Sequence, residues 1–112
     1  MSGWRVEIIP VAEREIKALS SDLQARFIHV AELLEALGPH RVSEPHIKPL
    51  RGKLWEMRMK GKDGIARAVY FATAGRRLVV VRAFAKKSQK TPNREINLSL
   101  QRMKDFLDGE SA

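Results

Sequence analysis

Three short strand patterns follow one another between residues 54 and 85, and they limit the possible folds more than any other feature of the sequence. Residues 54–60 alternate apolar and charged side chains, residues 65–72 are mostly apolar, and residues 77–85 are apolar and β-branched at their centre. The turns at residues 61–64 and 74–75 are too short for a crossover, and the first contains the Asp-Gly pair typical of hairpins. The sequence therefore predicts three neighbouring antiparallel strands.

Helical patterns lie on both sides of these strands. Residues 21–37 and 92–107 repeat apolar side chains at steps of three and four, which is typical of amphipathic helices, and a short helix is expected over residues 11–19. Residues 4–9 alternate like a strand, and the proline-containing residues 39–53 predict an irregular connection. The expected order is β-α-α-β-β-β-α, an α+β fold in which helices pack on an antiparallel sheet.

The composition bounds the class of protein. A chain of 112 residues with 44% apolar content forms one domain, residues 1–112, with a modest core. The chain contains no cysteine, which excludes disulfides and thiolate chemistry. No run of eighteen apolar residues and no signal-peptide core are present, so we expect a cytoplasmic protein without a membrane partner.

Cofactor and metal signatures are missing from the sequence. The histidines His29, His40 and His46 lack carboxylates or cysteines at ligand spacing, so no metal site is expected. The sequence also holds no Ser-His-Asp set, paired carboxylates, P-loop or dinucleotide-binding glycine pattern. We therefore expect no small-molecule cofactor.

Positive charge is concentrated in one part of the chain. The net charge is +8, and residues 48–104 carry sixteen lysines and arginines against three acidic residues, a net +13. The segments before and after them are acidic, with net charges of −2 and −3. A basic half of a small domain is typical of proteins that bind phosphates, whereas evenly scattered lysines would only keep a surface soluble.

A cationic turn at residues 84–92 joins the last strand to the last helix. It holds three lysines and ends in Thr91-Pro92, which predicts an N-cap followed by proline at the first helical position. Backbone N–H groups at a helix start add positive potential. The turn is therefore suited to binding an anion such as phosphate.

Four cations are the candidates for catalysis: Arg58, Arg67, Lys86 and Lys87. Neighbouring antiparallel strands can bring such side chains together into one patch. Crowded positive charge would help a lysine lose its proton and act as a base, and arginines would stabilise a five-coordinate phosphorus. In the alternative reading, Arg58 and Arg67 simply pair with Glu56, and the lysines keep a strand end soluble.

Polar and aromatic residues near these cations are candidates for contacts to a ligand. Tyr70, Ser88 and Gln89 can donate or accept hydrogen bonds. Trp4 and Trp55 are possible base-stacking platforms, but their positions favour the core.

Three stretches resemble the HigB-type branch of the RelE/ParE toxin superfamily. They are the Leu-Trp-Glu-Met-Arg run at residues 54–58, Arg67 with Tyr70, and the Phe-Ala-Lys-Lys-Ser-Gln-Lys-Thr-Pro run at residues 84–92. The similarity extends over about residues 50–107. It implies a RelE-like fold and the toxin of a type II toxin–antitoxin pair, which cuts messenger RNA on the ribosome and is held inactive by an antitoxin, often a helix-turn-helix protein.

The resemblance also implies roles for individual residues. It implies catalytic roles for Arg67, in the middle strand, and for Lys86 and Lys87. Arg58 is a weaker match to the family's catalytic residues. No histidine is expected on the sheet, which favours a site made of cations alone.

The expected reaction is metal-independent. The 2′-hydroxyl of the message attacks the adjacent phosphate, Lys86 or Lys87 assists deprotonation, and Arg58 and Arg67 stabilise the phosphorane. Tyr70 is placed near the RNA, and Gln89 and Lys90 hold its backbone.

The alternative keeps the fold without catalysis. It is a ParE-like inhibitor of DNA gyrase or a basic nucleic-acid-binding module. The sequence alone leaves open the codon preference, the antitoxin docking surface, the oligomeric state and the identity of the base.

Overall fold

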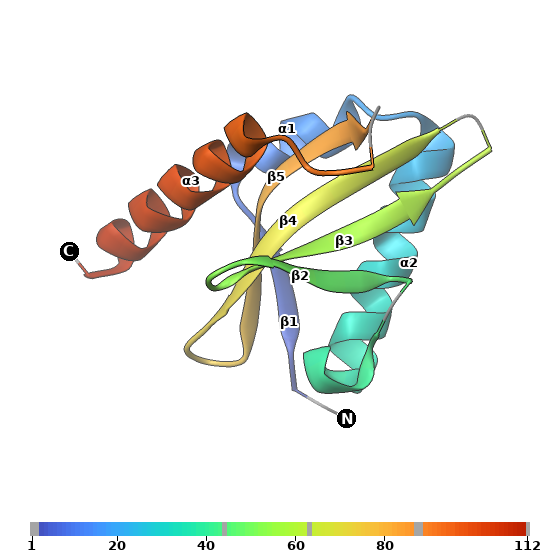
Figure 1. Cartoon of the computed structure of the whole chain (residues 1–112). Helices are drawn as coiled ribbons and strands as arrows, with labels where there is room; N and C mark the ends of the chain where they lie inside the picture. Colours follow the sequence, from blue (N-terminus) through green and yellow to red (C-terminus); the bar gives the residue numbers. More distant parts are fainter. Residues whose placement is uncertain (1–2, 44, 63, 87–88, 112) are drawn as a thin grey trace.

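The computed structural model describes residues 3–43, 45–62, 64–86 and 89–111, and it contains one five-stranded sheet with helices on both faces (Figure 1). The strand order across the sheet is β1-β5-β4-β3-β2. The strands are β1 Arg5–Ile8, β2 Ile47–Arg51, β3 Leu54–Lys60, β4 Ile65–Thr73 and β5 Arg77–Lys86. The helices are α1 Pro10–Lys17, α2 Ser21–Leu37 and α3 Asn93–Ser111, with a short 3₁₀ turn, η1, at Pro39–Arg41. The predicted α+β class and the three-strand meander are confirmed.

The first strand departs from the predicted antiparallel sheet. β1 pairs with β5 in parallel, with Arg5 opposite Arg77 and Ile8 opposite Val80, whereas all other neighbours are antiparallel. Alternation along a strand reports which side chains are buried and not which strand is the neighbour. The position and direction of β1 were therefore not readable from its pattern.

The irregular connection predicted over residues 39–53 is wrong for its second half. Ile47–Arg51 forms the edge strand β2, which pairs with β3 and shifts register between Pro49 and Arg51. Proline is tolerated in an edge strand because one side of that strand has no partner for its N–H groups. Pro49 therefore concealed a strand that carries two cations, the half-buried Lys48 and the exposed Arg51.

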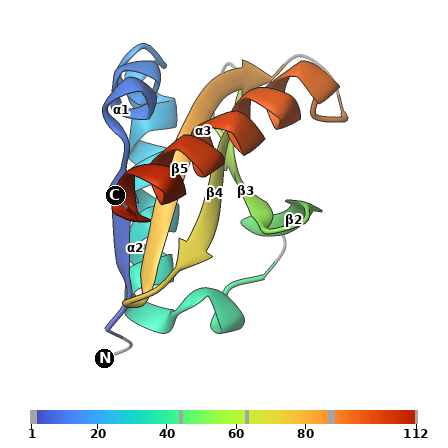
Figure 2. The ribbon, with the colours of Figure 1, turned by 90° about the vertical axis from the view of Figure 1, so that its left-hand side faces the viewer.

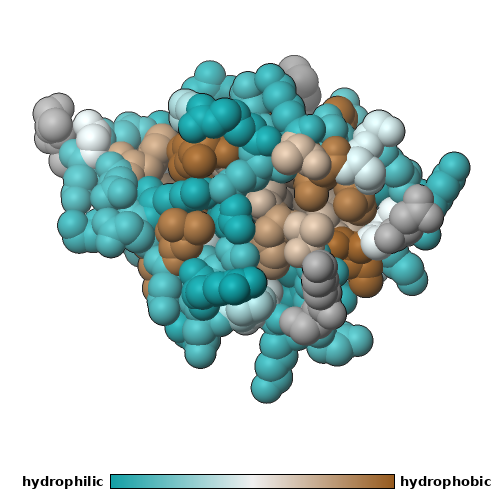
Figure 3. All heavy atoms as spheres, turned by 90° about the horizontal axis from the view of Figure 1, so that it is seen from above, coloured by the Kyte–Doolittle hydropathy of each residue, from teal (hydrophilic) through white to brown (hydrophobic). Residues whose placement is uncertain are grey.

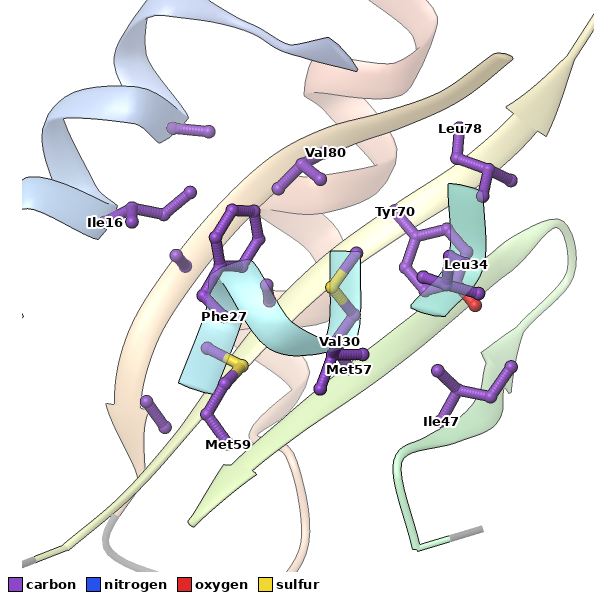
Figure 4. Close-up of a cluster of buried hydrophobic side chains, with 14 of the residues drawn as sticks. Ile16, Phe27, Val30, Leu34, Ile47, Met57, Met59, Tyr70, Leu78 and Val80 are labelled. Atoms are coloured by element: carbon purple, nitrogen blue, oxygen red, sulfur yellow. The ribbon is translucent and has the colours of Figure 1, made fainter. Parts of the chain in front are cut away.

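The two faces of the sheet are covered by different helices (Figure 2). On one face α1 and α2 pack on β3, β4 and β5, with Phe27, Val30 and Leu34 of α2 against Met57 and Met59 (Figure 4). On the other face α3 packs on a second cluster of buried side chains, which comprises Leu54, Val69, Phe71, Val79, Val81 and Ile96. Because successive residues of a strand point to opposite faces, β4 sends Ala66, Ala68 and Tyr70 toward α2 and Arg67, Val69 and Phe71 toward α3.

Ser20 is the N-cap of α2, and its hydroxyl accepts a hydrogen bond from the Leu23 amide at 3.3 Å. The Gln24 side chain donates to the Leu19 carbonyl at 2.8 Å, so it helps to close the turn between α1 and α2.

Apolar and hydrophilic side chains are both present on the surface. Seen from above, apolar atoms gather near the middle of the molecule and hydrophilic atoms surround them (Figure 3). The large apolar side chains with the greatest exposure come from α2, β3, β4 and α3, and they are Ile28, Leu37, Trp55, Ile65 and Leu98. Among the described residues, no helix is both long and apolar enough to cross a bilayer.

Candidate functional site

A buried ion pair between β3 and β4 forms the centre of the site. Arg67 and Glu56 both point to the α3 face, and their side chains are 1% and 0% exposed. Nη1 of Arg67 donates to Oε1 of Glu56 and to the Thr91 hydroxyl at 2.9 Å, and Nη2 donates to the Gln89 carbonyl at 3.0 Å. The Thr91 hydroxyl in turn donates to Oε2 of Glu56 at 2.7 Å. The alternative reading, in which Arg67 pairs with Glu56, is confirmed.

The electrostatics of Arg67 reflect this position. Burial lowers the pKa of Arg67, the Glu56 carboxylate raises it, and the nearby charge of Arg58 lowers it, so that the net direction is downward. An arginine still keeps its proton in proteins. The cluster therefore holds a permanent buried positive charge, compensated by one carboxylate.

Thr91 does not act as the predicted N-cap. Its hydroxyl is engaged by Glu56 and Arg67, and α3 begins at Asn93. The Pro92 carbonyl accepts hydrogen bonds from the amides of Glu95 and Ile96 at 3.0 and 3.2 Å. The turn before α3 is therefore fastened to the sheet through Thr91.

Lys86 meets Arg67 at a common acceptor. The Lys86 ammonium group at the end of β5 donates to the Gln89 carbonyl, which also accepts from Arg67. The two cations therefore lie on the same face of the sheet. Lys87, the fourth predicted catalytic cation, lies outside the described residues.

A groove of about 560 Å³ opens beside the cluster, between β2 and the start of α3. Arg67 and Thr91 contribute to its wall, and three further cations line it: Lys48, Arg51 and Lys90. Nζ of Lys48 lies 3.7 Å from Oε1 of Glu56, and Arg51 donates to Oδ1 of Asn93 at 3.3 Å. We name this surface the cationic groove.

Lys48 and Arg51 were missed as site residues. They lie in the segment whose prolines predicted an irregular connection, so nothing placed them opposite the cationic turn. The available signal was the charge of residues 48–104, a net +13.

Tyr70 and Arg58 lie on opposite faces of the sheet. Tyr70 is 1% exposed on the α2 face, and burial raises its pKa. Its ring lies in the apolar cluster under α2 (Figure 4), so the structure does not bring it to Arg67. Arg58 is opposite Arg67 in the strand register, so the two side chains point to the same face, and the charge of Arg58 lowers the pKa of Arg67.

The roles of the cationic turn differ between its residues. Gln89 contributes its backbone carbonyl to the cluster, although Gln89 itself is exposed to solvent. Lys90 is exposed and lines the cationic groove, as its predicted contact with an RNA backbone requires. No group of three metal-ligating side chains occurs within the described parts of the chain.

Two solved structures share the fold. A structure of a mutant E. coli toxin RelE in the free state has a TM-score of 0.63 and 16% identity, and the match covers 89% of this chain and 97% of that one. A crystal structure of the archaeal RelE–RelB complex from Pyrococcus horikoshii OT3 has a TM-score of 0.56 and 19% identity, with 74% of this chain and 94% of that one covered. At these identities the likeness establishes a RelE-like fold.

The sequence comparisons assign the family. No curated protein matches the sequence at a significant level. The family model of the phage-derived Gp49-like proteins (DUF891) matches residues 14–104, which is most of the chain. The protein therefore belongs to the Gp49-like family of phage-derived proteins.

Proposed function

We propose that the protein is the toxin of a type II toxin–antitoxin pair and cleaves messenger RNA on the ribosome. The observation that carries the proposal is the convergence of cations from separate strands on one face. Arg67 and Lys86 share an acceptor, and the groove beside them adds Lys48, Arg51 and Lys90. The RelE-like fold and the motif resemblance to the HigB-type branch support the same class of protein.

In the proposed mechanism, the groove holds the phosphates of a single strand through Lys48, Arg51 and Lys90. The 2′-hydroxyl attacks the adjacent phosphorus, the P–O5′ bond breaks, and the products are a 2′,3′-cyclic phosphate and a 5′-hydroxyl. Lys86 assists the proton transfer, together with Lys87, and Arg67 supplies positive charge beside the scissile phosphate. Glu56 is a positioning residue, because it holds the Arg67 guanidinium.

The ribosome has a geometric role in this proposal. Arg67 is buried and compensated by Glu56, so little free catalytic charge faces solvent. Alignment of the 2′-hydroxyl with the scissile bond then has to come from the ribosome, and such alignment is worth several powers of ten in rate. We expect clear cleavage of messages on translating ribosomes and weak cleavage of naked RNA.

We also infer an antitoxin partner that covers the cationic face. The archaeal protein with the same fold was solved as a RelE–RelB complex. The net charge of +13 over residues 48–104 favours an acidic segment as the inhibitor. A helix-turn-helix antitoxin agrees with the HigB-type resemblance.

The test is to map RNA ends after brief expression, and in a reconstituted translation system with and without ribosomes. Lys86→Ala is expected to lower the cleavage rate by about 100-fold or more, since lost proton-transfer help typically costs that much. Lys17→Ala is the matched control, because it removes the same charge from the exposed face of α1. Equal cleavage of naked and ribosome-bound RNA would contradict the ribosome-dependent mechanism.

The non-catalytic alternative makes a different prediction for the same variants. If Lys86→Ala and a Lys48→Ala/Arg51→Ala variant arrest growth as strongly as the parent, and no RNA ends appear, an inhibitor such as a gyrase-binding protein is favoured. Pull-down with purified gyrase would then identify the target.

A further inference from the structure

The α2 face of the sheet carries a pocket of about 470 Å³ where the helix ends. Leu34 is the last buried side chain of α2, and after Leu37 the chain turns at Gly38, whose φ is 81°, into the short turn η1. On the same face, Ala72 near the end of β4 is exposed. The pocket opens between η1 and the strands β2, β3 and β4.

Aromatic side chains form much of its wall. Trp55 is the register partner of Pro49 on one side and of Tyr70 on the other, so these three residues lie in one row across the sheet. Trp4, just before β1, adds a second indole ring. Trp55 is 38% exposed, so part of its ring can be reached from solvent. We name this site the aromatic pocket.

One polar group in the wall of the aromatic pocket lacks a partner. Tyr70 is 1% exposed, and its hydroxyl has no hydrogen-bond partner within the described chain. Figure 4 shows the Tyr70 ring beside Leu34 with its hydroxyl on the side of Ile47, which also lines the pocket. Burial raises the pKa of Tyr70, so the phenol keeps its proton and can both donate and accept. An unsatisfied buried hydroxyl is unfavourable, so a ligand that reaches it gains affinity.

The charge of the aromatic pocket differs from that of the cationic groove. The two sites share Pro49 of β2, but the groove is lined by Lys48, Arg51 and Lys90, whereas none of the described residues that line the pocket carries a permanent charge. A charged ligand would lose hydration in the pocket without gaining a counterion. A nucleobase would lose hydrogen bonds to water along its polar edges. The wall therefore favours an uncharged ligand with few polar atoms.

We propose that the aromatic pocket binds a small, uncharged aromatic molecule that carries one hydrogen-bonding group, of the indole or phenol class. Its ring packs against Trp4 and Trp55, and its polar atom reaches the Tyr70 hydroxyl. The volume lies within the range of about 300–1,000 Å³ that is typical of small-molecule sites, which are mostly apolar with a few polar groups. This binding activity is separate from RNA cleavage and does not depend on it.

The first test compares two ligands of the same shape by isothermal titration calorimetry. Indole carries an N–H group, whereas indene has the same two rings without it. We expect indole to bind the parent protein about tenfold more tightly, because its N–H group satisfies the Tyr70 hydroxyl. Tyr70→Phe should reduce this preference to below about twofold and should keep the affinity for indene.

The two tryptophans report on the position of the ligand. The chain contains only Trp4 and Trp55, so its NMR spectrum has one indole Nε1–H signal from each. Both residues line the aromatic pocket. Addition of unlabelled indole to the ¹⁵N-labelled protein should therefore move both signals.

A variant that fills the pocket gives an independent test. Ala72→Leu places a larger side chain in the wall and should weaken indole binding by about tenfold or more. Ala85→Leu is the matched control, because it adds the same side chain to an exposed alanine on the same face, at the opposite end of the β4–β5 pair. We expect this control to bind indole like the parent.

The inference is overturned if the parent binds indole no more tightly than indene, if the tryptophan signals do not move, or if Ala85→Leu weakens binding as much as Ala72→Leu. Tighter binding of adenosine than of indole would assign the pocket to a nucleobase and overturn it as well. Binding of N-acetyltryptophanamide without binding of free indole would assign the pocket to a side chain of a partner protein, which also contradicts the proposal.

Discussion

Two clusters of charge lie on the α3 face of the sheet, the first partly buried and the second fully buried, and they differ in what surrounds them. In the first, Arg82 of β5 donates to Glu15 of α1 at 2.6 Å and to Glu95 of α3 at 2.7 Å. Arg102 of α3 adds a hydrogen bond to Glu15 at 2.9 Å. Two arginines and two carboxylates thus join a strand to helices from both ends of the chain, and the charges balance.

The second cluster is the Arg67–Glu56 pair, which joins β3 and β4 to the turn before α3 through Thr91. It forms part of the wall of the cationic groove, and Lys48 approaches the same carboxylate. One carboxylate therefore faces more than one cation. The comparison suits a first cluster that joins the elements of the fold and a second that adds positive charge to the groove in which we propose that a phosphate binds.

The largest expected effect comes from breaking the second cluster. Arg67→Ala leaves Glu56 buried without its main partner, and removing one member of a buried ion pair costs about 3–5 kcal/mol of unfolding free energy. Urea denaturation would measure the loss. The double variant Arg67→Met/Glu56→Met should recover most of the stability, because it removes both charges, yet it should not cleave RNA. Full cleavage by the double variant would show that this cluster, too, only stabilises the fold.

A smaller effect is expected from the first cluster. Glu15→Gln keeps the size of the side chain but removes the charge that holds Arg82 and Arg102, and weakened charged hydrogen bonds cost about 2 kcal/mol. Glu13→Gln is the control on the same helix, since Glu13 is exposed and pairs with the exposed Lys17. Its effect should stay within about 0.5 kcal/mol. RNA cleavage at a temperature where both variants are folded should equal that of the parent.

Acid is expected to weaken the first cluster. Burial alone would raise the pKa of Glu15, but hydrogen bonds from Arg102 and the Ala83 amide, with the charge of Arg82, hold it below its ordinary value of 4.5. Because the folded pKa is lowered, Glu15 adds stability at pH values above 4.5, and that stability is lost as the pH falls through the folded pKa. Thermal unfolding between pH 7 and pH 3 should show a shallower acid loss in Glu15→Gln than in the parent. Identical slopes would contradict this role.

The smallest expected effect is that of Tyr70→Phe. The Tyr70 hydroxyl is buried on the α2 face and has no hydrogen-bond partner within the described chain. Removing an unsatisfied buried hydroxyl should leave stability unchanged or raise it by up to about 1 kcal/mol. RNA cleavage should also be unchanged, since Tyr70 and Arg67 point to opposite faces. A large loss of cleavage with normal stability would indicate that Tyr70 does belong to the functional site.

The sequence predicted the parts of the fold that depend on local pattern. Alternation predicted β3, apolar and β-branched runs predicted β4 and β5, and helical periodicity predicted α2 and α3. Each of these patterns reflects side-chain burial, which depends directly on the order of residues. The pairing of β1 and the existence of β2 depend on which distant segments meet, and the prolines around β2 pointed away from a strand. Those features required the three-dimensional structure.

The candidate site was predictable in its charge and less so in its geometry. The cationic run was recognisable by its three lysines, and Arg67 was recognisable because it interrupts an apolar strand face. The sequence could not show that Thr91 would bridge Arg67 and Glu56, or that Lys48 of the edge strand would approach the same carboxylate. Spacing along single strands does not report which side chains converge from the edge strand, the turn and the helices.

The parallel pairing of β1 with β5 has a consequence for the order of assembly. β1 spans residues 5–8, but its hydrogen-bonding partner lies at residues 77–80. The first strand to be synthesised therefore cannot pair until the last one has been synthesised. Contacts between segments so far apart form slowly, because a long loop has to close first. A nascent chain that ends before residue 77 has no partner for its first strand, so an incomplete product cannot complete the sheet.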